Sequence, residues 1–510
     1  MLLAFFIQNP LEFSDKICYT IQNDEKNDIM NKCTIIIKDE VNVKLEGLDP
    51  STRRKCSDKL KYFLPHAYHM PAYKLGRWDG TVRFCDVGGR TFLNLLDDVL
   101  PVIIEQGYEV AIDDRRKNEE MTFPTVTKNF WKGVTWPKGH EKAGELITLR
   151  DYQVEVINQF ISAPQCLQEI ATGAGKTIMT ATMSKVVEKY GRSIIIVPNK
   201  DLVRQTEEDY TNCGLDVGVY FGDKKDIGKT HTVCTWQSLN SLLKKTKRGE
   251  ANIQEFIEGV CCVIVDETHQ AKADVLKSLL TSVFANVPIR WGLTGTIPKS
   301  DWESASLRSS IGDVINRLSA KELQDQGVLA NCHVNIIQTQ ETASYTNYQN
   351  EMTFLLEDKR RLDFIANRIK NISVTGNTLV LTNRIKNGEA LQELIPNAEF
   401  VQGAMAVTDR KDAYNDINEG TNTVTIATYG VASVGINIPR IFNLVLLEPG
   451  KSFVRVIQSI GRGVRIAKDK DFVQIWDVTS RCKYSKRHLT QRKKYYKEAS
   501  YPFTIEKIEY

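Results

Sequence analysis

The sequence contains no apolar run that approaches the roughly 18 residues needed to cross a bilayer. The apolar start MLLAFFIQNP is short and has no basic leader, so we expect no secretory signal, and residues 1–29 are expected to form an N-terminal extension. None of the eleven cysteines belongs to a C-x-x-C pair. This argues against a zinc site and favours buried, reduced thiols in a cytoplasmic protein, or in the host cytoplasm if a phage encodes it.

A strong excess of either charge is also missing. The formal net charge is only +4 over 510 residues, so contact with nucleic acid must come from local basic patches and not from bulk charge. The flanks lack the clustered acidic residues of a nuclease site. The hydrophobic fraction of 42% and the charged fraction of 25% are ordinary for a globular protein, and the length predicts two to four domains.

The hydrophobic pattern changes along the chain. Residues 30–125 combine strand-like runs, an amphipathic helix and a hairpin signal at Asp79-Gly80, which predicts a small α+β domain. Residues 126–146 are expected to form a linker. Short β-branched runs then alternate with helical stretches, which is typical of α/β domains with parallel sheets. We predict two such domains in tandem, at 147–335 and 336–480, followed by a basic tail at 481–510 without a clear βα unit.

The first of these α/β domains carries ATGAGKT at 171–177, a glycine-rich loop that leads into a helix. Such loops let backbone N–H groups surround phosphate oxygens, and the helix N-terminus adds a positive dipole. Lys176 is expected to reach the terminal phosphates of a nucleotide, and the Thr177 hydroxyl to bind Mg²⁺. The strict pattern would place glycine at position 170, where this chain has Ile170. The predicted backbone cradle consists of Thr172, Gly173, Ala174 and Gly175.

A second motif, VIVDETHQ, ends an apolar run with Asp266 and Glu267. A carboxylate at the carboxyl end of a strand, beside a phosphate loop, is where Mg²⁺ has to be held, so we assign Asp266 to the metal and Glu267 to the attacking water. His269 follows directly, and LTGT supplies Thr294 and Thr296. These three residues are predicted to couple the hydrolytic site to the second α/β domain.

Two further patterns extend the predicted nucleotide site. Gln153, in LRDYQ, offers an amide that suits the adenine edge. In QSIGRGVR, Arg462 and Arg465 are three residues apart and have no carboxylate four residues before them, so we expect both on one helical face as arginine fingers. Gln458 in the same motif and Gly435 in ATYGVASVGINIP are further candidates for nucleotide contact.

In this order, the motifs around Gln153, ATGAGKT, IIIVPNKDLVRQ, VCTWQSL, VDETH, LTGT, LVLTN, ATYGVASVGINIP and QSIGRGVR resemble those of superfamily 2 helicases, over about residues 147–479. The small domain with AYKLGRWDG ahead of the motor is similar to the phage UvsW-type branched-DNA helicases. The resemblance implies two RecA-like domains with ATP and Mg²⁺ between them. It also implies 3′→5′ movement on DNA and remodelling of forks and four-way junctions.

Several polar and aromatic residues are candidates for contact with DNA. In the motor they are Asn199, Arg204, Gln205, Thr235, Trp236, Gln237 and Thr428, and in the small domain they are Lys74, Arg77, Trp78 and Arg83. Trp236 could stack on a base or belong to the core, and Trp78 presents the same choice. The segment KYSKRHLTQRKKYYK at 483–497 either binds a phosphate backbone or forms a solvated charged helix.

The leading hypothesis is an ATP-dependent helicase or translocase that remodels branched DNA, including Holliday junctions, in replication, recombination or repair. Its expected partners are single-stranded, duplex and branched DNA and other replication or recombination proteins, and no membrane. An RNA helicase is one alternative, since the motifs do not separate DNA from RNA. A motor subunit of a restriction or repair complex is another. A binder without enzymatic activity is disfavoured because both halves of the ATP site are present.

Overall fold

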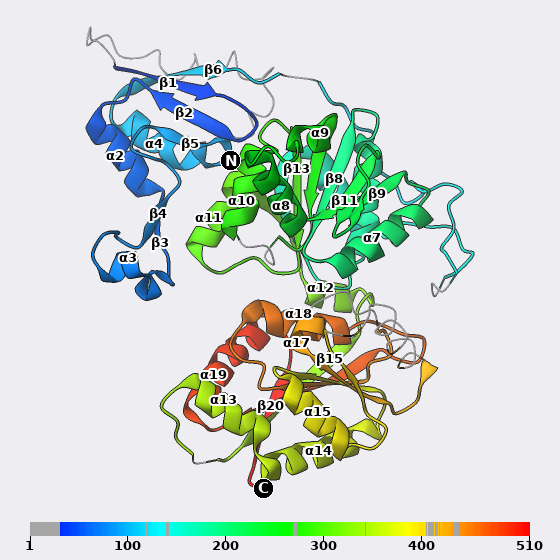
Figure 1. Cartoon of the computed structure of the whole chain (residues 1–510). Coiled ribbons are helices and arrows are strands. Elements are labelled where there is room, and N and C mark those ends of the chain that lie inside the picture. Colours follow the sequence, from blue (N-terminus) through cyan, green and yellow to red (C-terminus); the bar gives the residue numbers. More distant parts are fainter. Residues whose placement is uncertain are drawn as a thin grey trace. The chain divides into compact units, whose positions relative to one another are not determined.

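The computed structural model describes residues 31–117, 120–138, 142–268, 273–341, 343–403, 405, 413, 417, 419–432 and 438–510, without the side chains of 273, 432, 453–455, 458 and 462. The chain divides into two compact units, with residues up to 169 and 177–317 in the first and residues 170–176 and 318–510 in the second. The mixed α/β fold with parallel sheets agrees with the prediction (Figure 1). The division at 317/318 precedes the expected boundary at 335/336 because β15 (Asn331–Thr339) pairs with strands of the second unit.

The N-terminal part of the first unit is a four-stranded sheet covered by two helices (Figure 1). The strand order is β5-β2-β1-β6, with β1 antiparallel to β2 and parallel to β6. Alternating apolar residues of β1 meet apolar residues of α4 in one buried core, as expected for a sheet with one covered face. The elements are β1 (Asn31–Ile37), β2 (Asn42–Glu46), α2 (Pro50–Lys59), β5 (Arg90–Phe92), η3 (Leu93–Leu95), α4 (Leu96–Glu105) and β6 (Tyr108–Asp114).

The predicted hairpin around Asp79-Gly80 is wrong. The strand after it, β4 (Thr81–Arg83), pairs antiparallel with β3 (Lys61–Phe63), and the connection between them contains η2 (Ala67–His69) and α3 (Pro71–Lys74). Residues 71–74 are helical and residues 75–78 form turns and bends, so the residues directly before Asp79 do not form the first strand of a hairpin. The Asp79 carboxylate instead accepts a hydrogen bond from the backbone N–H of Thr81 at 3.0 Å, which starts β4.

The small domain is fixed to the first α/β domain by polar contacts. The Gln165 amide donates to the backbone oxygen of Glu40 at 2.8 Å and accepts from the Asn94 amide at 2.9 Å. The Lys277 ammonium lies 3.8 Å from the centroid of the Phe84 ring, and burial lowers the pKa of this lysine to about 8. These buried contacts would be lost in a motor fragment that lacks the small domain.

The stretch expected to be a linker packs on the α/β domain over its described residues, 126–138 and 142–146. The Trp131 indole is buried and donates to the Thr182 hydroxyl of α6 at 2.9 Å. The Asn158 side chain exchanges two hydrogen bonds with the backbone of Val126, both at 2.9 Å. Glycine and proline content identified a segment without regular structure but did not reveal that its tryptophan is anchored.

The first α/β domain is built on an eight-stranded sheet in the order β10-β9-β11-β8-β12-β13-β7-β14. The strands from β9 to β7 are parallel, so their carboxyl ends share one edge. The elements are α5 (Asp151–Ser162), β7 (Gln165–Ile170), α6 (Lys176–Val187), β8 (Arg192–Val197), α7 (Lys200–Asn212), β9 (Val217–Phe221), β10 (Lys224–Lys225), β11 (His231–Thr235), α8 (Trp236–Lys247), α9 (Ile253–Ile257), β12 (Val260–Val265), α10 (Ala273–Ser282), β13 (Ile289–Thr294), α11 (Asp301–Ser310) and β14 (Asp313–Leu318).

The second α/β domain has a seven-stranded, fully parallel sheet in the order β17-β18-β16-β19-β20-β15-β21. The elements are α12 (Ala320–Asp325), β15, α13 (Tyr348–Glu357), α14 (Lys359–Ser373), β16 (Thr378–Thr382), α15 (Ile385–Leu394), β17 (Glu399–Val401), β18 (Val424–Thr428), α17 (Tyr429–Ala432), β19 (Asn443–Leu447), α18 (Phe453–Gly463), β20 (Phe472–Ser480), α19 (Lys483–Glu498) and β21 (Phe503–Ile508).

The C-terminal residues are an integral part of this domain, in contrast to the predicted basic tail. β21 pairs in parallel with β15, and α19 connects it to β20. Arg492 of α19 is fully buried and makes a bidentate ion pair with Asp477, with both N–O distances 2.8 Å. The sequence pattern missed this unit because a helix with many cations looks solvated, although Leu489 and Tyr496 pack its inner face.

Every cysteine in the described part of the chain is buried and free of disulfide bonds. No helix in that part is long and apolar enough to cross a membrane.

Candidate active site

The glycine-rich loop lies between the end of β7 and the first residue of α6. Gly173 and Gly175 have φ values of +90° and +80°, in the left-handed region that glycine enters without steric cost. Loops with glycines in this region can turn successive backbone N–H groups toward a phosphate. Lys176 opens α6, and its ammonium donates to the backbone oxygen of Ile170 at 3.3 Å. Ile170 itself is fully buried, so the side chain that replaces the usual glycine belongs to the core.

Asp266 and Glu267 directly follow β12, at the same edge of the sheet. An Asp266 carboxylate oxygen accepts the Glu267 N–H at 2.9 Å. Glu267 has a φ of +52°, a conformation that costs energy for a residue with a side chain and is concentrated at functional sites. Both residues are half-buried. Asp266 and Glu267 are the residues for which a metal-side carboxylate and a base were predicted.

The LTGT turn after β13 touches this pair. The Thr294 hydroxyl donates to the Thr296 backbone oxygen at 2.8 Å and accepts the Thr296 N–H at 3.2 Å, which closes the turn. The Gly295 N–H then donates to the Glu267 carboxylate at 3.4 Å. The sequence singled out the two threonines, but the group that reaches Glu267 is the glycine N–H between them. Coupling to the second domain stays a prediction, and His269 lies outside the described residues.

Gln153 is buried near the start of α5, and its side-chain oxygen accepts the N–H of Arg150 at 2.9 Å. The residue therefore caps its own helix. Contact with an adenine edge stays a prediction and would have to use the amide NH₂ or follow rotation of the amide.

In the second unit, the two arginines do not share one helical face as predicted. α18 ends at Gly463, and Arg465 lies beyond it in a single antiparallel bridge with Leu329. The helix stops because this pairing requires an extended backbone, which the three-residue spacing could not show. The side chains of Arg462 and Gln458 and the whole of Gly435 lie outside the described residues, so their roles stay predictions.

Lys470 was not among the residues predicted to matter for the site. It is buried, and its ammonium donates to three backbone oxygens, those of Pro439, Gly463 and Arg465, at 3.0, 2.5 and 2.7 Å. Burial and the nearby Arg465 lower the pKa of Lys470 to about 7, whereas the three acceptors favour its protonated form. In the sequence the lysine stands in KDKD and looks solvated. Its hydrogen bonds to Gly463 and Arg465 fix the backbone segment that carries the Arg465 side chain.

We expect Lys470→Met to lower the free energy of unfolding of the second unit by roughly 3 kcal/mol, because three carbonyls lose a charged donor. The ATP turnover rate should fall while ATP affinity is kept, since the variant loosens the arginine segment and leaves the phosphate loop intact. Chemical denaturation and steady-state ATPase measurements test this, with the exposed neighbour Lys468→Met as the control. Equal stability of the two variants would contradict the anchoring role.

The motor residues predicted to contact DNA lie where strands end. Asn199 follows β8 and caps α7, accepting the N–H groups of Asp201 and Leu202 at 3.1 and 3.0 Å. The Asn199 side-chain nitrogen is buried without a hydrogen-bond partner among the described residues. Arg204 is exposed and Gln205 half-buried one turn further along α7. The unsatisfied Asn199 nitrogen lies at the sheet edge where contact with a DNA strand was predicted, and that contact stays a prediction.

The motif after β11 has mainly local contacts. The Thr235 hydroxyl accepts the N–H of Ser238 at 3.2 Å, and the Gln237 amide donates to the backbone oxygen of Pro198 at 3.0 Å. Trp236 packs against the core of the domain, which favours the core alternative over base stacking. Thr428 is half-buried at the end of β18. Contact of all four residues with DNA stays a prediction.

In the small domain, Lys74 and Arg77 are exposed in the connection between β3 and β4. Arg83 is instead paired with Asp58 at 2.7 Å, which weakens its candidacy for phosphate contact. The Trp78 indole donates to the backbone oxygen of Thr81 at 2.9 Å and is half-buried, so its polar edge is occupied. The aromatic residues of the same connection were not among the residues predicted to bind DNA.

Comparisons with known proteins agree with this arrangement. The family described as "Type III restriction enzyme, res subunit" matches residues 146–299, and the "Helicase conserved C-terminal domain" matches residues 360–467. The ATP-dependent DNA helicase uvsW of Enterobacteria phage T4 is 22% identical over 447 residues, covering 83% of this chain and 86% of that protein. The DNA 3'-5' helicase XPB of Kineococcus radiotolerans is 23% identical over 370 residues, covering 70% and 64%.

Among solved structures, a fragment of an HsdR subunit of a type I restriction enzyme from Vibrio vulnificus has a TM-score of 0.55 at 16% identity, covering 92% of this chain and 85% of that chain. This likeness concerns the fold alone. The first family match covers β7 to β13 and so spans the loop, the carboxylate pair and LTGT, and the second covers β16 to β19 of the second sheet. The chain is an ATP-dependent helicase, a hydrolase, and it resembles the superfamily 2 helicases and among them the phage UvsW-type enzymes.

Proposed function

We propose that this chain is an ATP-driven DNA translocase, moving 3′→5′, that unwinds or remodels branched DNA such as forks and Holliday junctions. The observation that carries the proposal is an exposed aromatic and basic loop in the small domain, which the ATP site does not need. Support for DNA comes from the T4 relative, whose name describes a DNA helicase and whose alignment covers 83% of this chain. The aligned part of this chain is longer than the stretch from 146 to 467 that the two family models span, so the similarity extends beyond the motor.

The residues of the first α/β domain suit ATP and Mg²⁺. The loop offers backbone N–H groups and the Lys176 ammonium to phosphate oxygens, and Thr177 and Asp266 offer a hydroxyl and a carboxylate, which are ligands that Mg²⁺ prefers. Bound Mg²⁺ would neutralise charge on the phosphates. Glu267 then orients and deprotonates the attacking water, and the Gly295 N–H holds its carboxylate in place.

The proposed branch-docking element is the connection from Phe63 to Trp78, which we call the aromatic loop. The Phe63, Tyr68 and Tyr73 rings pack edge to face or tilted, with centroids 5.1 to 5.8 Å apart. Despite this packing, Tyr68 is 59% exposed, and so are the neighbouring apolar side chains of Met70 (39%) and Leu75 (64%). An exposed aromatic and apolar surface of this kind marks an interaction site, and aromatic rings can stack on unpaired bases.

We expect Tyr68→Ala to weaken binding to a fork about tenfold while binding to linear duplex changes little, because a stacked base contributes roughly 1–3 kcal/mol and only a branch exposes bases. Fluorescence anisotropy with a fork and a duplex of equal length measures the ratio. Phe472→Ala is the control. This exposed ring is the first residue of β20, so it lies at the amino end of the strand, whereas the helicase motifs follow the carboxyl ends. An unchanged fork-to-duplex ratio in Tyr68→Ala would remove the branch-docking role.

The two alternatives predict different substrates. A restriction-type motor, which the HsdR fold likeness brings into consideration, should hydrolyse ATP on duplex DNA without separating strands. An RNA helicase should displace an RNA strand at least as well as a DNA strand. Strand displacement on DNA and RNA versions of one fork, compared with duplex-stimulated ATPase activity, separates the three functions. Displacement confined to the DNA fork supports the proposal.

A further inference from the structure

A cavity of about 580 Å³ opens beside the start of α19, in the second unit. Four cations contribute to its wall, namely Arg481, Lys483, Lys486 and Arg487, and Ser344 and Thr490 add hydroxyl groups. We call it the α19 cavity. None of its lining residues belongs to the nucleotide motifs, so the ATP site does not explain it.

The four cations are available to a ligand. All four side chains are exposed. Within the described part of the chain, none of them has a carboxylate oxygen within the 4.0 Å of an ion pair. Arg492, on the same helix, contrasts with them because Asp477 neutralises it in the core. The cavity wall therefore concentrates four positive charges within seven consecutive residues.

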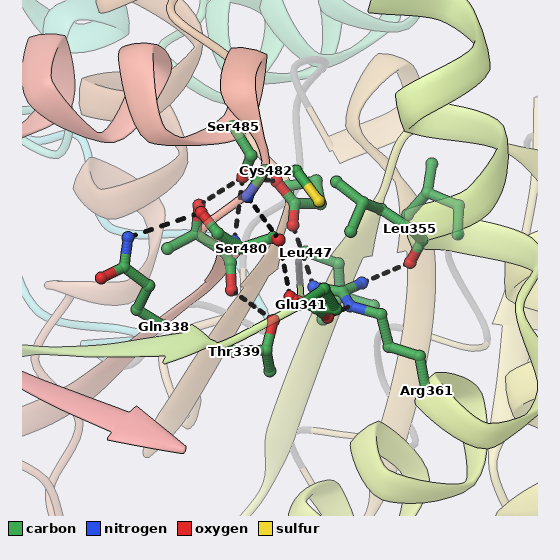
Figure 2. A network of polar contacts seen from close by, with 12 residues as sticks. Gln338, Thr339, Glu341, Leu355, Arg361, Leu447, Ser480, Cys482 and Ser485 are labelled. Carbon is green, nitrogen blue, oxygen red and sulfur yellow. Dashed lines mark hydrogen bonds and ion pairs between the residues drawn. The ribbon is translucent and has the colours of Figure 1, made fainter. Parts of the chain in front are cut away.

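The one carboxylate in the wall, Glu341, does not cancel this charge. Its oxygens accept hydrogen bonds from the Arg361 guanidinium at 2.9 Å and the Ser480 hydroxyl at 2.6 Å (Figure 2). Burial opposes ionisation of Glu341, but the charge of Arg361 and the bond from Ser480 outweigh it and lower the pKa. Glu341 is thus an ionised partner of Arg361, which also pairs with the buried Glu448 at 2.9 Å.

The same network fixes the wall of the cavity. The Ser485 hydroxyl donates to Glu448 at 2.7 Å. The N–H of Cys482 donates to the Ser480 hydroxyl at 3.0 Å (Figure 2). The buried Glu351 carboxylate accepts the N–H groups of Tyr484 and Ser485 at 3.0 and 2.7 Å. The N–H groups of Tyr484 and Ser485 in the first turn of α19 are therefore already satisfied, and attraction of an anion to the cavity rests on the four side chains.

The cavity lies at the edge of the sheet that the carboxyl ends of the strands form, and the motif residue Thr428 lies at this same edge. Arg481 follows β20 and Glu341 follows the adjacent β15, while Thr428 ends β18 in the same parallel sheet. Three to four strand spacings separate Thr428 from the cavity, or roughly 14 to 19 Å at about 4.8 Å per strand. A DNA strand that crosses the sheet edge at Thr428 can therefore reach the cavity within a few nucleotides.

We infer that the α19 cavity binds the phosphodiester backbone of the DNA that the motor moves, as a contact separate from the helicase motifs. Unpaired lysines and arginines on an ordered wall, with hydroxyl groups beside them, bind phosphates without reading sequence. Four cations in one wall suit several successive phosphates better than one small anion. This inference rests on the proposed function, because it takes DNA as the substrate.

The test compares salt-dependent DNA binding of the full chain and of Lys486→Gln/Arg487→Gln. Each phosphate contact with a single strand contributes about 0.7 to the slope of log affinity against log salt concentration, so losing two contacts should lower the slope by about 1.4. The matched control is Lys494→Gln/Lys497→Gln. It removes the same charge from the same helix at exposed positions outside the cavity, and its slope should stay near that of the wild type.

The outcomes are distinct. A wild-type chain that binds no DNA would refute the function proposed above before any variant is compared. A wild-type chain that binds DNA, with equal slopes for the cavity variant and the control, would overturn only the cavity inference. DNA-independent ATPase activity of all three proteins should be the same, which shows that the motor is folded.

A second arm separates DNA from a free anion. Titration calorimetry with inorganic phosphate is carried out on the wild type and on the cavity variant. Phosphate binding that the variant loses, together with an unchanged DNA slope, would assign the cavity to a free anion and reject the DNA assignment. Protection of Lys483 and Lys486 from acetylation by DNA, with Lys494 unprotected, is the result expected if the backbone occupies the cavity.

Discussion

Glu267→Gln should reduce the ATP turnover rate by roughly 10²- to 10⁴-fold, the usual contribution of a positioned general base. ATP affinity should be kept, because Lys176 and the Mg²⁺ ligand Asp266 remain. The glutamine oxygen can still accept the Gly295 N–H, so the strained backbone at this position, with its φ of +52°, keeps its support. The loss would therefore report the missing base and not a disordered loop. Single-turnover hydrolysis together with nucleotide binding at equilibrium measures both quantities.

The matched control for this variant is Glu169→Gln. Glu169 belongs to β7 and accepts the N–H of Ile297 at 3.2 Å, so it is a carboxylate at the same sheet edge. A turnover rate within a few-fold of the wild type is expected for it. If Glu267→Gln hydrolyses ATP as fast as this control, the assignment of the base is wrong.

Arg462→Ala and Arg465→Ala should each lower the turnover rate by about 10³- to 10⁵-fold, the contribution of an arginine finger, with little change in ATP affinity. A finger acts on charge that develops in the transition state, so its removal affects turnover more than binding. The effects of the two variants should not add, since residues that act as a unit lose most of the rate in the first substitution.

Arg368→Ala is the control for the arginine variants, because it removes a half-buried guanidinium from the same unit, which pairs with the exposed Glu506 at 2.7 Å. Arg465→Lys should recover little activity if the planar guanidinium is what the phosphate requires. A defect confined to ATP binding in both alanine variants would rule out the finger role of this segment.

The sequence by itself determined the parts of the molecule that depend on neighbouring residues. The positive φ values of Gly173 and Gly175, the helix start at Lys176 and the carboxylates after β12 follow from local backbone chemistry, so a linear pattern identifies them. Alternation of β-branched runs and helical stretches likewise predicted two parallel-sheet domains. The identity of the family followed from the order of these local motifs.

Only the tertiary structure decided the features that depend on partners far along the chain. The pairing of β4 with β3, the end of α18 before Arg465 and the insertion of β21 beside β15 are set by long-range pairing that no local pattern encodes. The burial of charged residues was the least predictable feature, because a lysine or arginine gives the same sequence pattern whether its side chain is solvated or buried. Lys470 and Arg492 are inside because backbone carbonyls and a carboxylate, brought beside them by folding, satisfy them there, whereas Lys486 and Arg487, which precede Arg492 on α19, line an open cavity.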